Sequence, residues 1–381
     1  MYDAIVIGLG GMGSATLYQL ALSGCKVLGL EQFEIGHAMG SSHGSTRIIR
    51  LAYSEGPEYV PLLRAAYRYW RELERAADLE EPLLHVTGGL DIGPQGSWTV
   101  EGSKKSCLEH GIEFEQLGGA DINREFPGYC LPASMTAIYQ RDGGYLLSEA
   151  AIHAHIECAT SAGACVRSGT EVTGWSRQRS GLRVETPDAA FDTKRLVITA
   201  GPWIGRLCSQ LQPYCQAERQ VMLWTAPPAP DRFKPERFPV FVMESPLGRF
   251  YGFPDHCGQG FKIGKFHHLR QRVENPSAMD RACQPEDEAA LREGIAGYFP
   301  EADGPTRRAA ACIFTNTPDG HFILDRLPGD EDVFVAAGFS GHGYKFCSVV
   351  GRIMADFCQD RSPAWDIDRF RLSPRRWSGR A

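Results

Sequence analysis

The first 31 residues constrain the fold more than any other part of the chain. They contain an apolar run ending at Ile7, glycines at positions 8, 10 and 13, and a helical run. A second apolar run, Val27 to Leu30, follows and is succeeded by Glu31. In a G-x-G-x-x-G turn between strand and helix, the three glycines allow the tight turn, the approach of a pyrophosphate and close helix packing, in that order. The helix N-terminus offers N–H groups to phosphates. We therefore predict a Rossmann-like dinucleotide-binding fold in which Gly8, Gly10, Gly13 and Glu31 contact the cofactor, and the acid disfavours a 2′-phosphate.

Length and charge exclude several classes of protein. A chain of 381 residues exceeds what one core usually supports, so we expect two domains. The formal net charge of −6 leaves no basic excess for a nucleic-acid partner. No apolar run reaches the roughly 18 residues of a membrane span. The Arg-rich tail, 375–380, is interpreted as a solvated terminus.

The cysteines and histidines do not form a metal-binding pattern. Twelve cysteines are scattered without a C-x-x-C pair. His153 and His155 are two apart on an expected helix and point to different faces. We therefore expect no metal site. Because the first strand starts at Tyr2, no signal peptide is expected, and free thiols in the cytoplasm are the simplest interpretation.

Further along the chain, the hydrophobic pattern alternates between helix and strand and then becomes that of an antiparallel sheet. Residues 59–75 and 148–162 are expected as helices, and 195–199 as a buried strand. Residues 216–265 alternate apolar and polar side chains with repeated Gly and Pro, which is typical of an antiparallel sheet. Helices are also expected over 284–299 and 345–358, and strands over 87–93 and 333–337.

These elements predict an α/β plus antiparallel β architecture. We expect a discontinuous Rossmann-like domain, formed by residues 1–82, 147–215 and 321–381, for the cofactor. We expect residues 83–146 and 216–320 to form a substrate domain built on a mixed or antiparallel sheet. Near the end of the chain, Gly341 and Gly343 belong to a glycine-rich loop before a helix, which aims N–H groups at negative charge. The alternative is an ordinary strand-to-helix turn.

Four cations stand in apolar or glycine-rich surroundings. Arg47 and Arg50 flank Ile48-Ile49, and Lys262 and Lys345 each have apolar or glycine neighbours. Guanidinium groups match flat carboxylates and phosphates. Each cation is either a surface group whose stem covers apolar atoms or a buried charge facing an anionic ligand.

Five segments together carry a resemblance to a known family. They are Ser41-Ser42-His43-Gly44-Ser45-Thr46-Arg47-Ile48-Ile49-Arg50, Ala52-Tyr53-Ser54-Glu55-Gly56, Tyr251-Gly252-Phe253-Pro254, Ala311-Cys312, and Gly338-Phe339-Ser340-Gly341-His342-Gly343-Tyr344-Lys345-Phe346. Over nearly its whole length the chain resembles the monomeric sarcosine oxidase family. That family includes N-methyltryptophan and pipecolate oxidases and belongs to the D-amino-acid-oxidase-like flavoproteins.

The resemblance implies an FAD enzyme that oxidises the N–C bond of secondary amino acids and passes electrons to O2, giving H2O2. Cys312 would hold the flavin covalently, although a lone cysteine is otherwise more often a core residue. Arg50 and Lys345 would bind the substrate carboxylate, and Lys262 would lie where oxygen is reduced. The remaining implied positions are Tyr251 and Phe314 on the substrate side, Tyr251, His43 and Arg47 in catalysis, and Ser42, Thr46, Arg47 and Lys345 at the flavin.

Two positions depart from the family pattern. Phe314 stands where sarcosine oxidase has a tyrosine, and Phe266 stands where an active-site histidine is expected, with His267 one residue later. In a strand, that shift turns a side chain to the other face. Both changes make the pocket more apolar, so we expect a secondary or N-methyl amino acid larger than sarcosine.

Three alternatives remain open at this point. One is an FAD dehydrogenase that uses another electron acceptor, the second is a non-catalytic dinucleotide-binding protein, and the third is a nicotinamide-dependent dehydrogenase. The combination of Arg50, Lys262, Cys312 and Lys345 favours the oxidase. The resemblance also favours a monomer whose only partners are a small amino acid and O2.

Overall fold

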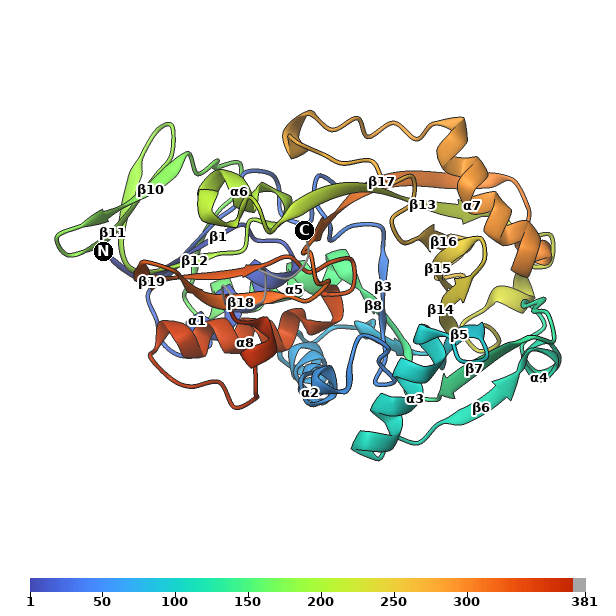
Figure 1. Ribbon diagram of the computed structural model, residues 1–381. Coiled ribbons are helices and arrows are strands. Elements are labelled where there is room, and N and C mark those ends of the chain that lie inside the picture. Colours follow the sequence, from blue (N-terminus) through green and yellow to red (C-terminus); the bar gives the residue numbers. More distant parts are fainter. Residues whose placement is uncertain (373–381) are drawn as a thin grey trace.

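The computed structural model describes residues 1–372, which form three β-sheets with helices around them (Figure 1). The tail at 375–380 lies outside the described residues. Within residues 1–372, no helix is both long and apolar enough to cross a membrane. None of the twelve cysteines, all of which lie within residues 1–372, forms a disulfide bond.

The first sheet has a parallel centre that begins with the N-terminal segment. Its order is β9-β2-β1-β12-β19-β18, with β9 to β19 parallel and β18 antiparallel. The hairpin β10–β11 pairs antiparallel with the first half of β12. The strands are β1 (Tyr2–Ile7), β2 (Val27–Leu30), β9 (Cys165–Arg167), β10 (Gly174–Gln178), β11 (Gly181–Glu185), β12 (Ala190–Ile198), β18 (Ile323–Leu327) and β19 (Asp330–Ala337). Because parallel strands end at one edge, they form a crevice there for a ligand.

Four helices pack together beside this sheet. They are α1 (Gly11–Leu22), α2 (Val60–Ala77), α5 (Ser148–Ser161) and α8 (Cys347–Cys358). α1 contacts α5 and α8, and α2 contacts the same two helices; Figure 1 shows α1 and α8 on the same side of the strands. A Cβ on Gly351 would lie 2.5 Å from the Ala15 carbonyl carbon, so α8 depends on this glycine to approach α1.

The second sheet is mixed and lies at the other end of the molecule (Figure 1). Its order is β17-β13-β16-β15-β14-β5-β7-β6, and only β14 and β5 pair in parallel. The strands are β5 (Gly89–Pro94), β6 (Glu115–Gly118), β7 (Met135–Gln140), β13 (Gln216–Thr225), β14 (Val240–Ser245), β15 (Gly248–Phe253), β16 (Phe261–Lys265) and β17 (Thr306–Asn316). The expected antiparallel region, 216–265, supplies four of these strands.

The remaining helices are short or lie near the second sheet. The α-helices are α3 (Trp98–His110), α4 (Gly119–Glu125), α6 (Ile204–Leu207) and α7 (Pro285–Tyr298). The 3-10 helices are η1 (Pro57–Tyr59), η2 (Gly201–Trp203), η3 (Ser209–Leu211), η4 (Pro230–Phe233), η5 (Pro276–Ala278), η6 (Pro300–Ala302), η7 (Tyr344–Phe346) and η8 (Asp368–Phe370).

A third sheet, not foreseen from the sequence, connects the expected domains. It has the antiparallel order β3-β8-β4, formed by β3 (Thr46–Ile49), β8 (Gly144–Leu147) and β4 (Leu84–Val86). Strands of three or four residues are too short to show a periodic pattern. The sheet takes strands from both expected domains, and β8 crosses the boundary at 146/147, so the domain limits stay a prediction.

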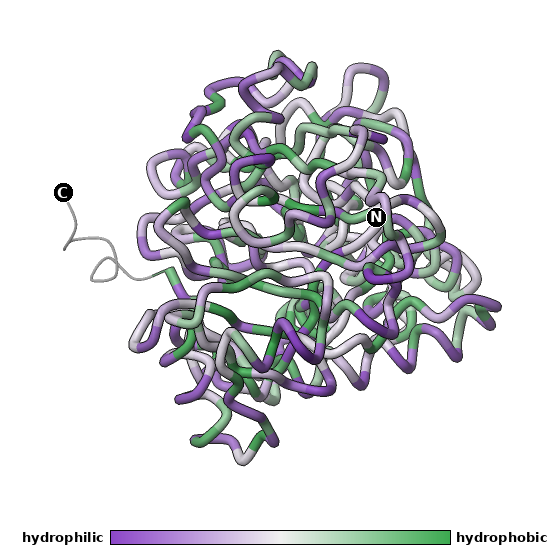
Figure 2. Tube along the Cα trace, turned by 90° about the vertical axis from the view of Figure 1, so that its right-hand side faces the viewer, coloured by the Kyte–Doolittle hydropathy of each residue, from purple (hydrophilic) through white to green (hydrophobic). Residues whose placement is uncertain are grey.

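The core matches the predicted fold class. The central strands of the first sheet are buried from Ala4 to Ile7 and from Leu196 to Ile198, as expected for parallel strands covered on both faces. Hydrophobic stretches lie mainly inside the molecule, with hydrophilic loops outside (Figure 2). Some predicted boundaries are wrong. The strands expected from 195 and 333 start earlier, at Ala190 and Asp330, and the helix expected from Lys345 starts with η7, so that α8 begins at Cys347.

Candidate functional site

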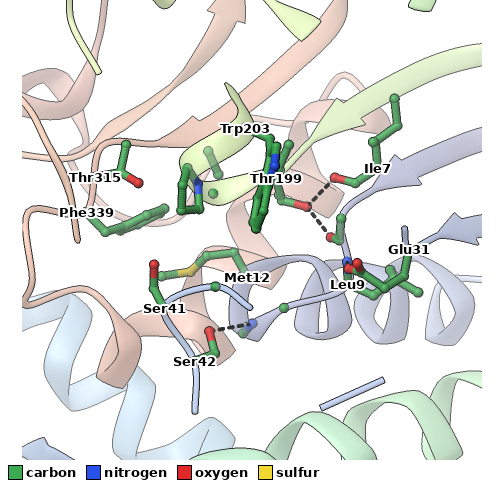
Figure 3. A pocket seen from close by; sticks show the side chains of 18 of the residues that line it. Ile7, Leu9, Met12, Glu31, Ser41, Ser42, Thr199, Trp203, Thr315 and Phe339 are labelled. Carbon is green, nitrogen blue, oxygen red and sulfur yellow. Dashed lines mark hydrogen bonds between the residues drawn. The ribbon is translucent and has the colours of Figure 1, made fainter. Parts of the chain in front are cut away.

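A pocket lies at the crevice formed by the ends of the parallel strands (Figure 3). It is lined by residues that follow β1, β2 and β12, among them Gly8, Glu31 and Thr199, and by the loop after β19. Thr199 Oγ1 donates hydrogen bonds to the carbonyls of Ile7 (3.0 Å) and Gly8 (2.7 Å). These bonds fix the turn after β1 against the end of β12.

The three N-terminal glycines have the steric roles that the sequence predicts. Gly8 has φ +85°, and a Cβ there would lie 2.8 Å from the Thr199 carbonyl oxygen. A Cβ on Gly13 would lie 1.8 Å from the Gly8 carbonyl oxygen, so only glycine lets α1 pack here. A Cβ on Gly10 would meet nothing closer than Ser42 Oγ, at 3.6 Å, which leaves this backbone open to the pocket. The turn therefore fits the close approach of a pyrophosphate.

Glu31 presents a buried carboxylate to the pocket. It is 4% exposed and accepts hydrogen bonds from the Leu9 N–H at 2.7 Å and the Phe33 N–H at 3.0 Å. Ser42 Oγ accepts a weaker bond from the Gly11 N–H at 3.3 Å. Two backbone donors hold Glu31 in place, and its carboxylate oxygens have further lone pairs for ribose hydroxyls.

The C-terminal glycine-rich loop forms the facing wall. Gly341 and Gly343 line the pocket, and Gly341 has φ +77°. A Cβ on Gly341 would lie 2.3 Å from the Phe314 ring, so this loop packs directly on the end of β17. The loop therefore lies where it could contact a cofactor, and its role in binding stays a prediction.

Arg47 also lines the pocket, and backbone oxygens fix its guanidinium. Nη2 donates to the carbonyls of Ser41 (2.8 Å) and His43, and Nη1 donates to the Thr46 carbonyl (2.8 Å). No carboxylate among residues 1–372 forms an ion pair with it. The guanidinium also interacts electrostatically with Glu149, and the rest of its charge is available to an anionic group in the pocket.

Lys262 is a buried cation and not a surface lysine. It is 1% exposed, and Nζ donates to the Gly44 carbonyl (2.7 Å), the Thr46 carbonyl (2.8 Å) and Thr46 Oγ1 (3.0 Å). Nζ also lies 4.2 Å from the centre of the Phe253 ring. Burial and the neighbouring Arg47 hold the pKa of Lys262 well below its usual value. An anion nearby would restore the charged form.

His43 and Cys312 are buried near the same cations. His43 is 2% exposed, and neither ring nitrogen has a hydrogen-bond partner within the described part of the chain. Burial and Arg47 lower its pKa to about 3, so the ring is neutral. Cys312 is 2% exposed, and burial raises the pKa of its thiol. Phe314, two residues along β17, lines the pocket, and alternation in a strand places Cys312 on the same face.

A second cationic group surrounds Arg50. Its Nε lies 2.9 Å from Asp91 Oδ1, and its Nη2 lies 3.1 Å from Glu55 Oε2. Arg249 pairs with the other oxygen of Glu55 at 2.8 Å. Burial opposes the ionisation of Glu55, but Arg50 and Arg249 outweigh it and hold its pKa well below the usual range. Burial raises the pKa of Asp91 to about 6 despite Arg50.

Lys345 joins this group from the C-terminal loop. Its side chain is buried, Nζ donates to the His342 carbonyl at 2.6 Å, and Nζ lies 5.2 Å from the centre of the Tyr53 ring. The Arg50 guanidinium lies 4.7 Å from the same ring. Burial and the repulsion of Arg50 lower the pKa of Lys345 to about 7. The structure thus brings Arg50 and Lys345 together on Tyr53, as the sequence prediction requires.

An aromatic wall lies between the pocket and the Arg50 group. Tyr251 and Phe266 have ring centres 5.1 Å apart, and Phe266 and Phe314 have ring centres 6.1 Å apart. Arg249 lies over Phe266 at 4.6 Å. His267 does not replace the expected histidine: β16 ends at Lys265, and His267 is 55% exposed and pairs with Glu218 at 3.0 Å. Its displacement comes from a turn, with φ +55°, and not from alternation within a strand.

The predicted residues fall into two sets. The pocket lining includes Gly8, Gly10, Glu31, Ser42, Arg47, Phe314, Gly341 and Gly343. The other predicted residues are not among those that line it, namely Gly13, His43, Thr46, Arg50, Tyr251, Lys262, Cys312 and Lys345. Sequence reasoning missed the carboxylates Glu55 and Asp91, and also Arg249. Asp91 could have been noticed as a lone acid inside an apolar strand.

The chain belongs to a known family. A family model described as "FAD dependent oxidoreductase" matches residues 3–357. Monomeric sarcosine oxidase from Streptomyces avermitilis is 38% identical over 380 residues, which cover 98% of this chain and 97% of the relative. N-methyl-L-tryptophan oxidase from Citrobacter koseri is 35% identical and covers 98% of each chain. This chain is an FAD-dependent oxidoreductase.

Solved structures agree with this assignment at the level of the fold. The open form of NikD, described as an unusual amino acid oxidase essential for nikkomycin biosynthesis, superposes with a TM-score of 0.82 and 25% identity, covering 98% of this chain and 97% of NikD. Glycine oxidase from Geobacillus kaustophilus gives a TM-score of 0.79 at 21% identity and covers 98% of each chain. The expected resemblance, fold class and flavoprotein oxidoreductase class are confirmed.

The hydrogen bonds of Glu31 predict that the Glu31→Gln variant binds FAD with lower affinity. The amide keeps the size of the side chain but removes the charge and directs an NH2 group at the N–H of Leu9 or Phe33. A hydrogen bond to a charged group contributes roughly 1.5–3 kcal/mol, so we expect flavin affinity to fall about 10- to 100-fold. Both variants also carry Cys312→Ala, so that no covalent bond at this cysteine retains the flavin, and the flavin-to-protein absorbance ratio after purification and dilution then measures the loss. Glu34→Gln, at an exposed neighbouring acid, is the control, and equal flavin content in both variants would refute the role of Glu31.

Proposed function

We propose that this enzyme oxidises the N–C bond of secondary amino acids, either N-methylated or cyclic, that are larger than sarcosine. The imine product would hydrolyse, and O2 would be reduced to H2O2. The observation that carries the proposal is a largely buried group of three cations and two carboxylates beside an aromatic wall. We also propose that the protein acts as a cytoplasmic monomer.

The charge balance supports a substrate with one carboxylate. Arg50, Arg249 and Lys345 are three cations, whereas Glu55 and Asp91 are two anions. With Asp91 ionised and Lys345 protonated, one positive charge is left without a partner in a buried site. An unpaired buried charge is costly, so a single carboxylate would complete the group. A bound carboxylate would favour the protonated form of Lys345 more than that of the two arginines, because only the lysine has a depressed pKa.

The aromatic wall supports a side chain or ring on the substrate. Phe266 and Phe314 offer no hydrogen-bond donor where related enzymes carry histidine and tyrosine. Burial of apolar area stabilises a complex by about 25 cal/mol per Å². A larger apolar group on the substrate would therefore contribute more binding free energy here than the bare methylene of sarcosine. The names of two relatives, sarcosine oxidase and N-methyl-L-tryptophan oxidase, include one small and one large N-methyl amino acid.

The residues of the pocket fit FAD and have distinct roles around it. When bound, FAD supplies the acceptor for the two electrons of the N–C bond. The glycine turn and Glu31 would hold its dinucleotide part, Arg47 would face its anionic form, and Cys312 would attach it covalently. Lys262 would stabilise the negative charge that oxygen gains during reduction, because a fixed cation in a buried site needs no reorganisation.

The substrate class is tested by anaerobic mixing of the purified protein with sarcosine, N-methyltryptophan, proline, pipecolate and several primary amino acids. We expect the visible flavin band to bleach with the secondary amino acids, and faster with the large ones than with sarcosine. Admission of air should then restore the band. If no secondary amino acid bleaches the flavin, the proposed substrate class is wrong.

The role of Lys262 separates an oxidase from an FAD dehydrogenase. In Lys262→Met, we expect reoxidation by O2 to slow roughly 100-fold or more, as for the loss of one preorganised electrostatic group, with flavin reduction largely retained. Stopped-flow absorbance resolves the two half-reactions. Lys265→Met, on the same strand but only half buried, is the matched control. An equal loss in both half-reactions would argue against an oxygen-specific role.

Covalent attachment is a separate prediction. Flavin should stay with the parent protein after acid precipitation, and Cys312→Ala should release it into the supernatant. Cys107→Ala removes another buried thiol and should leave the attachment intact. Yellow supernatant from the parent protein would show that the link does not exist.

The depressed pKa of Lys345 predicts a pH-dependent affinity for carboxylates. A carboxylate binds the protonated lysine, so the Kd of cyclohexanecarboxylate, which has no amine, should rise above about pH 7 by up to roughly tenfold per pH unit. Perturbation of the flavin spectrum between pH 6 and 9 measures the Kd. Lys345→Arg stays charged at every pH and should abolish the dependence. The same slope in the parent and in this variant would assign the titration to another group.

A further inference from the structure

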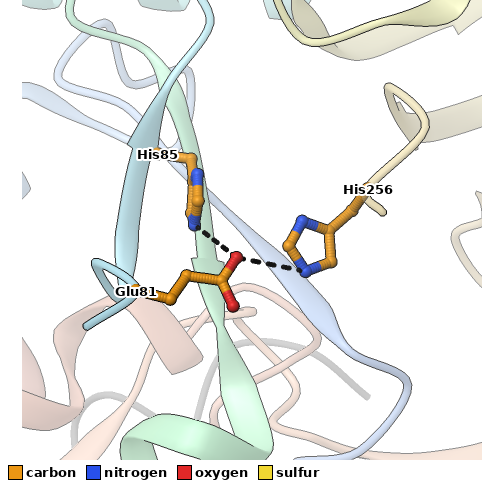
Figure 4. A group of neighbouring side chains, drawn as sticks. All are labelled: Glu81, His85 and His256. Atoms are coloured by element: carbon orange, nitrogen blue, oxygen red, sulfur yellow. Dashed lines mark ion pairs between the residues drawn. The ribbon is translucent and has the colours of Figure 1, made fainter. Parts of the chain in front are cut away.

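Two histidines and a glutamate meet at the junction of the three-stranded sheet and the β15–β16 loop (Figure 4). Glu81 follows α2, His85 lies in β4, and His256 lies between β15 and β16. Glu81 Oε1 lies 3.6 Å from His85 Nε2 and 3.8 Å from His256 Nε2. One ligand atom from each of the three residues lies within 4.8 Å of the other two.

These separations suit a shared metal ion better than they suit direct hydrogen bonds. Hydrogen bonds of this type are about 2.7–3.2 Å long, and both observed distances are longer. A metal ion about 2.0–2.2 Å from each ligand in a tetrahedral site separates the ligand atoms by roughly 3.3–3.5 Å. His85 Nε2 is inaccessible to solvent and has no hydrogen-bond partner among residues 1–372. Small side-chain movements would bring all three atoms onto one ion.

Tyr145 positions both imidazoles beside Glu81. The His85 ring stacks on Tyr145 with centres 4.9 Å apart and an interplanar angle of 8°. The hydroxyl of Tyr145 lies 3.2 Å from His256 Nδ1. If Nδ1–H donates to that hydroxyl, Nε2 carries the free lone pair and faces Glu81, an orientation typical of outer-shell support for metal ligands.

We propose that Glu81, His85 and His256 form a binding site for a divalent first-row metal ion, with Zn²⁺ as the preferred occupant. Two imidazoles and a carboxylate suit zinc, whereas Mg²⁺ and Ca²⁺ prefer oxygen ligands alone. Glu81 is 52% exposed, so a water molecule could reach the ion and complete its coordination. The expectation of no metal site rested on spacing in the sequence, but His85 and His256 are 171 positions apart and meet only in the fold.

The ion would stabilise the connection between two sheets. It would tie the β15–β16 loop to β4 and to the end of α2. His256 is three residues beyond Phe253, whose ring lies beside Lys262. The site is separate from the dinucleotide pocket, since none of its residues lines that cavity. Binding to the folded state alone should raise the thermal midpoint.

The test uses the full-length flavoprotein, treated with a chelator and desalted. Isothermal titration with ZnCl2 should show one equivalent bound and a rise in the thermal unfolding midpoint, whereas MgCl2 should have no effect. His85→Gln and His256→Gln should each weaken zinc binding at least tenfold. Glu81→Gln alters an exposed side chain and provides a third variant if either histidine variant fails to fold. The flavin spectrum of each variant reports its folding.

Matched controls separate this site from adventitious binding. His267→Gln changes a histidine that pairs with a single glutamate, Glu218, and should bind zinc like the parent. Cys257→Ser removes the exposed thiol next to His256 and should also leave binding intact. The proposal is wrong if the parent binds no zinc, or if binding persists in all three ligand variants, which would place the ion on other groups.

Discussion

The contact between Gly13 and the carbonyl of Gly8 is the constraint on which the rest of the site depends. Any side chain at Gly13 would meet a backbone oxygen that cannot move aside. The contact sets α1 against the end of β1, and α1 in turn packs against α5 and α8. These packed elements bring the glycine turn, Glu31 and the C-terminal loop to the same crevice. The pocket thus follows from steric packing at one turn before any charge is considered.

Buried charge is the second organising factor. Arg47 and Lys262 donate hydrogen bonds to neutral oxygens. Arg50 instead pairs with the carboxylates of Glu55 and Asp91, and Arg249 pairs with that of Glu55. Cations held by neutral oxygens are not neutralised by an ion pair, and an anion nearby would favour the charged form of Lys262, whose pKa is depressed by burial and by Arg47. Cations paired with carboxylates are largely neutralised, so Lys345 supplies the excess in that group. The two arrangements suit two different anions: an anionic cofactor in the first and a carboxylate in the second.

Much of the fold was predictable because its elements are long and periodic. The N-terminal βαβ unit, the helix 148–162 and the antiparallel region all have clear patterns, and all three were predicted correctly. The third sheet was missed because strands such as Leu84–Val86 are too short to show a period. The start of α8 was placed too early because the sequence does not distinguish a 3-10 turn from a first α-helical turn.

The site was predictable only where a local motif carried it. Gly8, Gly13 and Glu31 follow from one motif, and their geometry agrees with it. Asp91 and Arg249 could not be assigned from the sequence, because their role arises when β5 and β15 bring them to the Arg50 group. The meeting of His85 and His256 depends in the same way on the pairing of distant strands.

The most direct test of the account compares each cyclic amino acid with the same ring lacking its carboxylate, proline with pyrrolidine and pipecolate with piperidine. The rate of anaerobic flavin reduction per unit concentration is measured for each compound. If the buried positive charge of Lys345 selects the substrate, each amino acid should react at least roughly 100-fold more efficiently than its amine, because a hydrogen bond to a charged group contributes about 1.5–3 kcal/mol and two cations would contact the carboxylate. Equal efficiency within each pair would contradict the account.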